Sequence, residues 1–266
     1  MANVTISGQE LHDMICVAAA FLEKNKKAID ALNVFPVPDG DTGINMSLTL
    51  QTAAREVRDG KKETVGQVGS ALALGSLKGA RGNSGVILSQ IFRGFGKALQ
   101  DKQTMDAALL AECMEMGVES AYKAVMKPAE GTILTVSRLA AAQAAAAARE
   151  ENAAESVLEA AIREGQEALA DTINQNPVLK KAGVVDAGGK GFLVILQGML
   201  DSLRGEPMPQ VEEESAPADK ADFVAMAAED ITFAFDTVFI VRKHTEEVDL
   251  EPFRTYLNSI GDSLVI

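Results

Sequence analysis

Tryptophan is absent from this chain of 266 residues, and tyrosine, cysteine and histidine occur twice each. Cys16 and Cys113 lie in apolar helical patterns and far from any C-x-x-C spacing, so we expect buried thiols rather than a disulfide or a metal site. His12 and His244 have no serine or cysteine arranged with them as in a catalytic triad. These scarce residues disfavour a triad hydrolase and indicate a reducing compartment, the cytoplasm.

Positive charge and long apolar runs are also scarce. The chain has 25 Lys and Arg against 38 Asp and Glu, a formal net charge of −13 at pH 7. Nucleic-acid binding requires a basic surface and aromatic stacking, so we expect no nucleic-acid partner. No apolar run approaches the ~18 residues of a membrane span, so we expect none. A polyphosphate ligand would need metal ions or backbone N–H groups to offset the acidic charge.

Helical periodicity dominates residues 1–204 and predicts one mostly α-helical domain. The first helix begins at Ser7, where the sequence S-G-Q-E is a capping box with Glu10 three residues after the cap. Glycine, proline or asparagine breaks separate the other expected helices, which cover residues 43–58, 64–76, 84–100, 104–126, 131–149, 153–174 and 188–204. The prediction is therefore eight helices.

The composition changes at Gly205, which predicts a domain boundary. Residues 205–221 are rich in Pro, Glu and Ala without apolar periodicity, as in an exposed linker. Residues 222–266 predict a small α+β piece, with a strand in ITFAFDTVFIV, a helix in EPFRTYLNSI and the start of a strand in GDSLVI. So short a piece buries too little surface to fold alone. We therefore expect a fragment of a longer protein, or packing on a partner or on a second copy as a homodimer.

Two acids one position apart occur in the stretch NVFPVPDGDTGINM. Asp39 and Asp41 offer the oxygen ligands that Mg²⁺ prefers, and Asn33 offers an amide oxygen. Thr42 and Gly43 open a helix, where unpaired N–H groups favour an anion. An Asp-Gly turn followed by a helix cap explains this stretch equally well.

Two further glycine-bearing stretches precede apolar helices. In LKGARGNSGVIL, the backbone around Gly82, Asn83 and Ser84 is suited to hold phosphate, while a helix connection capped by Ser84 is an equal alternative. In KPAEGTILTV, Gly131 and Thr132 open a helix whose next residues, Ile133 and Leu134, are able to pack against an adenine ring. Taken alone, this stretch is better explained as a plain N-cap.

The fourth stretch, GVVDAGGKGF, contains Asp186, Gly188, Gly189 and Lys190 ahead of the last helix. Lys190 is suited to face a phosphate, and Asp186 to fix the loop or reach the water shell of a metal. So many glycines cost conformational entropy. We therefore expect a flexible lid or a close backbone approach to a ligand rather than a generic turn.

In this order, the four stretches resemble the ATP-binding domain of the fatty acid kinase A family, which is similar to the ATP-binding subunit of bacterial dihydroxyacetone kinases. The resemblance covers about residues 7–204, and the stretch ITFAFDTVFIVRK with LNSIGDSLVI resembles the start of the middle domain of that family. It implies an eight-helix antiparallel barrel that holds ATP and two Mg²⁺ ions at one end.

The resemblance also implies roles for individual residues. Asn33, Asp39 and Asp41 would bind the metal, with both aspartates essential to catalysis. The nucleotide would contact Thr42, Gly43, Asn45, Gly82, Asn83, Ser84, Gly131, Thr132, Ile133 and Leu134, and a loop from Asp186 through Gly188, Gly189 and Lys190 would close over it. The dihydroxyacetone kinase subunit carries an acid where this chain has Asn33, which favours the fatty-acid branch.

That branch phosphorylates a fatty acid presented by a separate lipid-binding partner protein and gives an acyl phosphate. A carboxylate acceptor is already ionised at neutral pH, so the chemistry needs no general base. The alternatives are the nucleotide-binding subunit of a dihydroxyacetone kinase and a non-catalytic nucleotide-binding scaffold.

Overall fold

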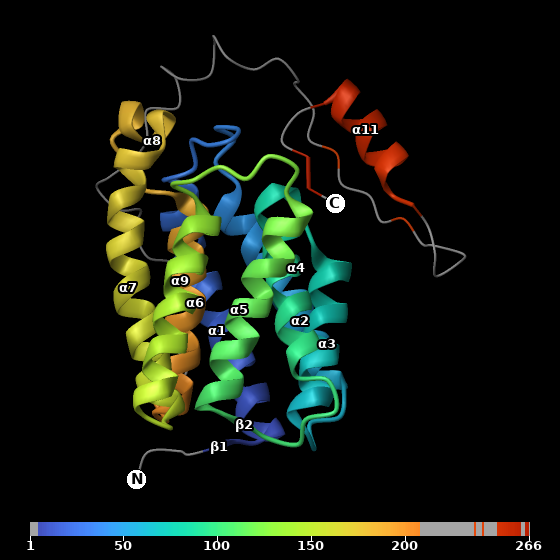
Figure 1. Cartoon of the computed structure of the whole chain (residues 1–266), viewed down its shortest axis with the longest axis vertical. Helices are drawn as coiled ribbons and strands as arrows, with labels where there is room; N and C mark the ends of the chain where they lie inside the picture. Colours follow the sequence, from blue (N-terminus) through green and yellow to red (C-terminus); the bar gives the residue numbers. More distant parts are fainter. Residues whose placement is uncertain (1–4, 208–236, 238–240, 242–248, 262–263, 266) are drawn as a thin grey trace.

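The structure, a computed structural model, describes residues 5–207, 237, 241, 249–261 and 264–265 and is mostly α-helical (Figure 1). Eight long helices run alternately up and down: α1 (Gly8–Asp30), α2 (Thr42–Asp59), α3 (Val65–Gly79), α4 (Gly82–Ala98), α5 (Ala107–Ala124), α6 (Ile133–Glu150), α7 (Ala154–Gln175) and α9 (Ala187–Leu203). A short α8 (Pro177–Ala182) lies between α7 and α9, and α11 (Glu251–Ile260) lies beside the bundle.

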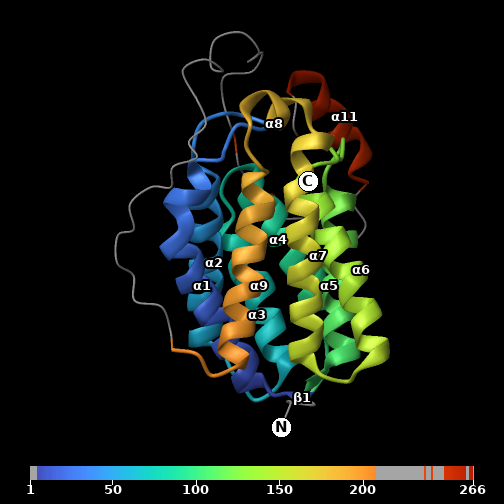
Figure 2. The ribbon, with the colours of Figure 1, turned by 90° about the vertical axis from the view of Figure 1, so that its left-hand side faces the viewer.

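The eight long helices close into an antiparallel barrel (Figure 2). Each packs against the next along the chain, and α9 packs against both α7 and α1. The interior is apolar, with Leu11, Leu50, Leu72 and Leu88 fully buried. Because the helices alternate in direction, the α1–α2, α3–α4, α5–α6 and α7–α9 connections all lie at one end, the upper end in Figure 1. The expected fold is confirmed, and its topology gathers the four glycine-bearing stretches at that end.

Side-chain caps fix several helix starts. Ser7 and Glu10 form the predicted capping box, in which Ser7 Oγ accepts the Glu10 N–H at 3.2 Å and Glu10 Oε2 accepts the Ser7 N–H at 2.7 Å. Thr64 and Gln67 form a second box at the start of α3. Such reciprocal caps satisfy N–H groups that have no partner within the helix, so they define where each helix begins.

Two predictions of local structure were wrong. Residues 104–126 were expected to form one helix, but β2 (Met105–Asp106) pairs antiparallel with β1 (Thr5–Ile6), and α5 begins only at Ala107. The helix α8, which has six residues, was not predicted from the sequence. Asn176 caps α8 and proline occupies its first turn, but so short a helix has too few turns to show apolar periodicity.

The C-terminal piece is described in part. The predicted EPFRTYLNSI helix is confirmed as α11, and Val265 forms an antiparallel bridge with Val125 on the barrel. Residues 208–221 of the expected linker, most of the expected ITFAFDTVFIV strand and His244 lie outside the described residues. The proposed domain boundary therefore stays a prediction. Within the described ranges, no helix is long and apolar enough to cross a membrane.

Candidate functional site

The paired acids lie in the α1–α2 connection at the upper end of the barrel. Partial desolvation, the charge of Asp41 and a hydrogen bond between the two carboxyl groups together raise the pKa of Asp39 to about 6. Two acids held this close favour a shared proton or a bound cation, since either offsets their repulsion. No group of three or more His, Cys, Asp or Glu side chains in the described part of the chain could hold a metal. Asp39 and Asp41 place two carboxylates side by side there, the oxygen donors that a hard cation prefers.

The start of α2 is already occupied by side chains. Asp30 Oδ1 accepts the N–H groups of Gly43 and Ile44 at 2.7 and 3.1 Å, and Asn33 Oδ1 accepts the Thr42 N–H at 2.9 Å. The expectation of unpaired N–H groups at this helix start was therefore wrong, because it overlooked the acid that ends α1. The buried Asn33 also bonds the Thr42 hydroxyl and donates from Nδ2 to Val37 O at 2.7 Å, so it fixes the loop.

The start of α4 differs from the start of α2. Its N-cap residue is Arg81, whose side chain makes no cap bond, so the alternative of a cap by Ser84 was wrong. Ser84 and Asn83 instead lie half-buried in the first helical turn, after Gly82 with its φ of +56°. In this first turn the N–H groups of Gly82, Asn83 and Ser84 precede the first intrahelical bond, from Gly85 N to Arg81 O. Of the four long helices that start at this end, α4 has a first turn whose N–H groups are not bonded by a capping side chain, so its start is suited to receive an anion.

The α4 start is held close to α2. Thr49 Oγ1 donates to Asn45 O at 2.7 Å and also to Gly79 O at 3.2 Å. A Cβ at Gly85 would lie 2.5 Å from Thr49 Oγ1, so glycine permits this approach. Asn45 therefore lies on the part of α2 that contacts the second glycine stretch.

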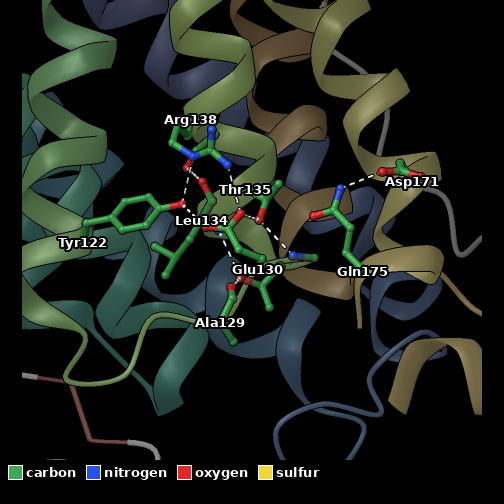
Figure 3. Close-up of polar contacts among 11 residues, drawn as sticks. Tyr122, Ala129, Glu130, Leu134, Thr135, Arg138, Asp171 and Gln175 are labelled. Carbon is green, nitrogen blue, oxygen red and sulfur yellow. Dashed lines mark hydrogen bonds and ion pairs between the residues drawn. The ribbon is translucent and has the colours of Figure 1, made fainter. Parts of the chain in front are cut away.

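A polar network fixes the α5–α6 connection (Figure 3). Glu130 Oε2 accepts from Arg138 at 2.9 Å and from the Thr135 hydroxyl at 2.7 Å, and Tyr122 donates to Oε1 at 3.3 Å. These bonds, led by that of Thr135, hold the pKa of Glu130 below its usual range. Thr135 in turn accepts the N–H of Gly131 at 2.8 Å. The sequence reading named Gly131 but missed the three side chains on α5 and α6 that hold it.

The predicted N-cap at Thr132 is confirmed: its hydroxyl accepts the Leu134 N–H at 3.3 Å. The N–H of Ile133 is bonded to the Asp186 carboxylate instead. Ile133 and Leu134 are both buried. These residues support the connection, and their contact with a nucleotide stays a prediction.

The fourth stretch is helical rather than a loop. Gly188, Gly189 and Lys190 lie in the first turn of α9, so the expected flexible lid was wrong. Close backbone approach explains the glycines, since a Cβ at Gly189 would lie 2.8 Å from Val136. Lys190 is exposed, and its predicted phosphate role is untested.

Asp186 ties the third and fourth stretches together. Its Oδ2 accepts the Gly189 N–H at 2.7 Å, and its carboxylate also accepts the Ile133 N–H, so it caps both α9 and α6. Burial raises the pKa of Asp186 to about 6, an effect that these two bonds offset only in part. Further along α9, Gly191 packs on Met46 of α2. This contact joins the fourth stretch to the first.

Comparisons with known proteins agree with this architecture. The family described as the DAK2 domain matches residues 36–201. Protein YloV of Bacillus subtilis (strain 168) is 46% identical over 275 residues, covering 100% of this chain and 50% of the relative. Uncharacterized protein SAB1090 of Staphylococcus aureus (strain bovine RF122 / ET3-1) is 43% identical over 271 residues, covering 98% and 49%. The chain thus spans about half the length of both relatives.

Among solved structures, the dihydroxyacetone kinase from C. freundii, determined in complex with AMP-PNP and Mg²⁺, matches with a TM-score of 0.52. The match covers 72% of this chain and 33% of that chain at 18% sequence identity. At this identity the similarity is one of fold.

Proposed function

The chain belongs to the DAK2 domain family, and from this membership we propose that it is an ATP- and Mg²⁺-dependent phosphotransferase module. We further propose that its acceptor is the carboxylate of a fatty acid presented by a lipid-binding partner protein. One observation carries the proposal: the neighbouring carboxyl groups of Asp39 and Asp41 and the uncapped start of α4 lie at the same end of one barrel.

The paired acids fit a divalent cation. Asp39 is exposed and Asp41 half-buried, and the two carboxyl groups are close enough to share a hydrogen bond, which is costly for two negative charges without a counterion. Asp39 and Asp41 would hold Mg²⁺ there, and the ion would neutralise phosphate charge during transfer. The fold neighbour from C. freundii was solved with AMP-PNP and Mg²⁺, which supports this cofactor pair.

Other groups at this end would bind the phosphates of the nucleotide or fix the loop of the paired acids. The N–H groups of the α4 start would receive phosphate oxygens, and Arg81, exposed beside them, would add a positive charge. Asp30 and Asn33 would keep Asp39 and Asp41 in place by fixing both ends of their loop. The chain would therefore act by positioning and by charge neutralisation.

A carboxylate acceptor fits these groups. One of its oxygens would form a bond to the γ-phosphorus of ATP while the bond to the β,γ-bridging oxygen breaks, which gives acyl phosphate and ADP. No proton has to leave the acceptor, because a carboxylate is ionised at neutral pH. Asn33, where the dihydroxyacetone kinase subunit carries an acid, favours this acceptor over a hydroxyl.

A surface suited to the partner protein borders the site. Four large apolar side chains are 43–47% exposed: Ile44 and Leu48 in the first two turns of α2, and Leu74 and Leu77 in the last two turns of α3. Because α2 and α3 are packed antiparallel neighbours, both pairs lie toward the upper end of the barrel. We assign this α2–α3 patch to the acyl-carrying partner, whose fatty acid has to reach that end.

Titration calorimetry with ATP and Mg²⁺ tests the nucleotide site. We expect wild type to bind ATP only with Mg²⁺, and Asp39→Asn with Asp41→Asn to lose this metal dependence. Asp59→Asn, at the exposed far end of α2, is the matched control and should bind as wild type. If the double variant keeps metal-dependent ATP binding, the ligand assignment is wrong.

The second candidate is a dihydroxyacetone kinase subunit, which the C. freundii fold match favours. Incubation of the ATP-loaded chain with each type of acceptor protein separates the two functions. ADP formation with a fatty-acid-loaded partner supports the proposal. ADP formation only with a dihydroxyacetone-bearing partner would replace it.

A further inference from the structure

A hollow on the side of the barrel is lined by residues of α4, α5 and α11. It is a groove of about 210 Å³, lined on α4 by Gln90, Arg93, Gly94 and Lys97, on α5 by Met116, Glu119, Ser120, Lys123 and Ala124, and on α11 by Arg254. We call it the α4–α5 groove. At about 30 Å³ per water molecule, this volume suits a compact ligand rather than a chain segment.

The charge of the α4–α5 groove is opposite to that of the whole protein. Four cationic side chains line it, Arg93, Lys97, Lys123 and Arg254, against the single carboxylate of Glu119. The chain as a whole has a net charge of −13. Cations gathered in a concave surface attract an anion more strongly than the same charges dispersed over a convex one.

The one carboxylate in the groove is already shared. Lys123 Nζ lies 2.5 Å from Glu119 Oε1, and Lys123, with a weaker effect of Lys97, holds the pKa of Glu119 below its usual range. On α4, Arg93 is paired only with a neutral group, the amide oxygen of Gln90 at 3.4 Å. Lys123 is paired with Glu119 and Arg254 with Glu251, so among the described residues Arg93 and Lys97 are the two cations of the groove without a carboxylate partner.

Arg254 supplies the second, independent observation. Among the residues that the structure describes, its Nε is the one buried side-chain nitrogen or oxygen without a hydrogen-bond partner. Nη1 of the same guanidinium lies 3.2 Å from Glu251 Oε1, so some but not all of its N–H groups have an acceptor. A buried donor without an acceptor is destabilising. Since Arg254 lines the groove, its guanidinium is available to an acceptor oxygen bound there.

We propose that the α4–α5 groove binds a small oxyanion, a phosphate or carboxylate compound, which holds α11 against the barrel. Arg254 would contact the anion from α11, while Arg93 and Lys97 would contact it from α4. The anion would thereby link the C-terminal helix to the kinase barrel. This inference is independent of the proposed function, because none of these residues belongs to the nucleotide site.

Titration calorimetry with inorganic phosphate, and separately with citrate, tests the binding and distinguishes the two sources of oxyanion. We expect saturable binding of at least one anion, weakened at least about tenfold in both Arg254→Gln and Lys97→Gln, since each loses a charged hydrogen bond. Lys97→Gln changes the barrel itself, so it tests the site even if Arg254→Gln disturbs α11. Arg163→Gln, exposed on α7, is the matched control and should bind as wild type.

Hydrogen exchange tests the link to α11. We expect the bound anion to slow amide exchange in residues 251–260 of wild type but not of Arg254→Gln. Asp39→Asn with Asp41→Asn should still bind the anion, since these residues lie in the α1–α2 connection. Absence of saturable binding, equal binding by wild type and both groove variants, or loss of binding in the Asp39 and Asp41 double variant would overturn the groove site. Unchanged exchange in α11 on anion binding would overturn its anchoring.

Discussion

Asp30 Oδ1 accepts the backbone N–H of Gly43 at 2.7 Å, so the last turn of α1 caps the first turn of α2. The same oxygen also accepts the Ile44 N–H at 3.1 Å. Burial raises the pKa of Asp30, and the nearby charge of Asp41 adds to this effect against the two N–H bonds. Asp30, which lies outside the stretch NVFPVPDGDTGINM, therefore fixes the loop that carries Asp39 and Asp41.

Removal of this cap should destabilise the domain. We expect Asp30→Ala to lower the free energy of unfolding by about 1–2 kcal/mol, because two N–H groups lose their acceptor. Asp30→Asn keeps an acceptor oxygen and should cost clearly less. Urea unfolding measures both, with Asp59→Ala as the exposed control. Equal losses for the two Asp30 variants would contradict the cap.

Substitutions at Gly131 and Gly183 distinguish the cost of backbone strain from the cost of side-chain crowding. Both have φ near +70°, but a Cβ at Gly131 would lie 2.9 Å from Gln175 Cβ, while one at Gly183 would meet nothing within 4 Å. Alanine at either position carries the left-handed backbone cost of about 1–2 kcal/mol. We expect Gly131→Ala to lose roughly 1 kcal/mol more, from overpacking. Thermal or urea unfolding of the two variants checks this difference, and equal stability would refute it.

Asp186 should make stability depend on pH. Its pKa of about 6 in the folded protein exceeds the usual value of about 3.9, so between these values the folded state keeps a proton that the unfolded state has released. Stability should therefore fall as pH rises through this window, by about 2–3 kcal/mol. Asp186→Asn keeps an acceptor for Gly189 and removes the titration.

Urea unfolding of Asp186→Asn and wild type at about pH 4 and pH 7 measures this effect. We expect the variant to gain stability relative to wild type as the pH rises. Asp186→Ala should lose the cap at both pH values and serves as the comparison. A difference between Asp186→Asn and wild type that is the same at both pH values would contradict the prediction.

The α2–α3 patch predicts a kinetic change without a change in nucleotide binding. We expect Leu48→Ser with Leu77→Ser to raise KM for the fatty-acid-loaded partner at least about tenfold, because apolar contact at the interface is lost. ATP affinity and kcat should stay at wild-type values, and exposed substitutions should leave stability nearly unchanged. Tyr256→Ser, 62% exposed on α11, is the control. An unchanged KM for the partner would remove the patch from the docking surface.

Much of the barrel could be predicted from the sequence, because long amphipathic helices carry their own signals. Apolar periodicity predicted all eight long helices, and the capping box at Ser7 marked the start of α1. The strand at Met105 could not be predicted, because its two residues pair with Thr5 and Ile6, far away along the chain. The local apolar pattern indicates which secondary structures a segment is able to form, and pairing with distant residues selects one of them.

For the site, the sequence by itself determined which four stretches interrupt the helices and that Asp39 and Asp41 stand together in one of them. Only the tertiary structure decided which helix starts are free. Asp30 and Asn33 fill the start of α2, and Asp186 fills those of α6 and α9, while the start of α4 has no cap from Arg81. The cap of α9 by Asp186 is local, whereas the caps of α2 and α6 depend on side chains 9 to 53 positions away meeting in space, because antiparallel helices bring every second connection to one end of the barrel.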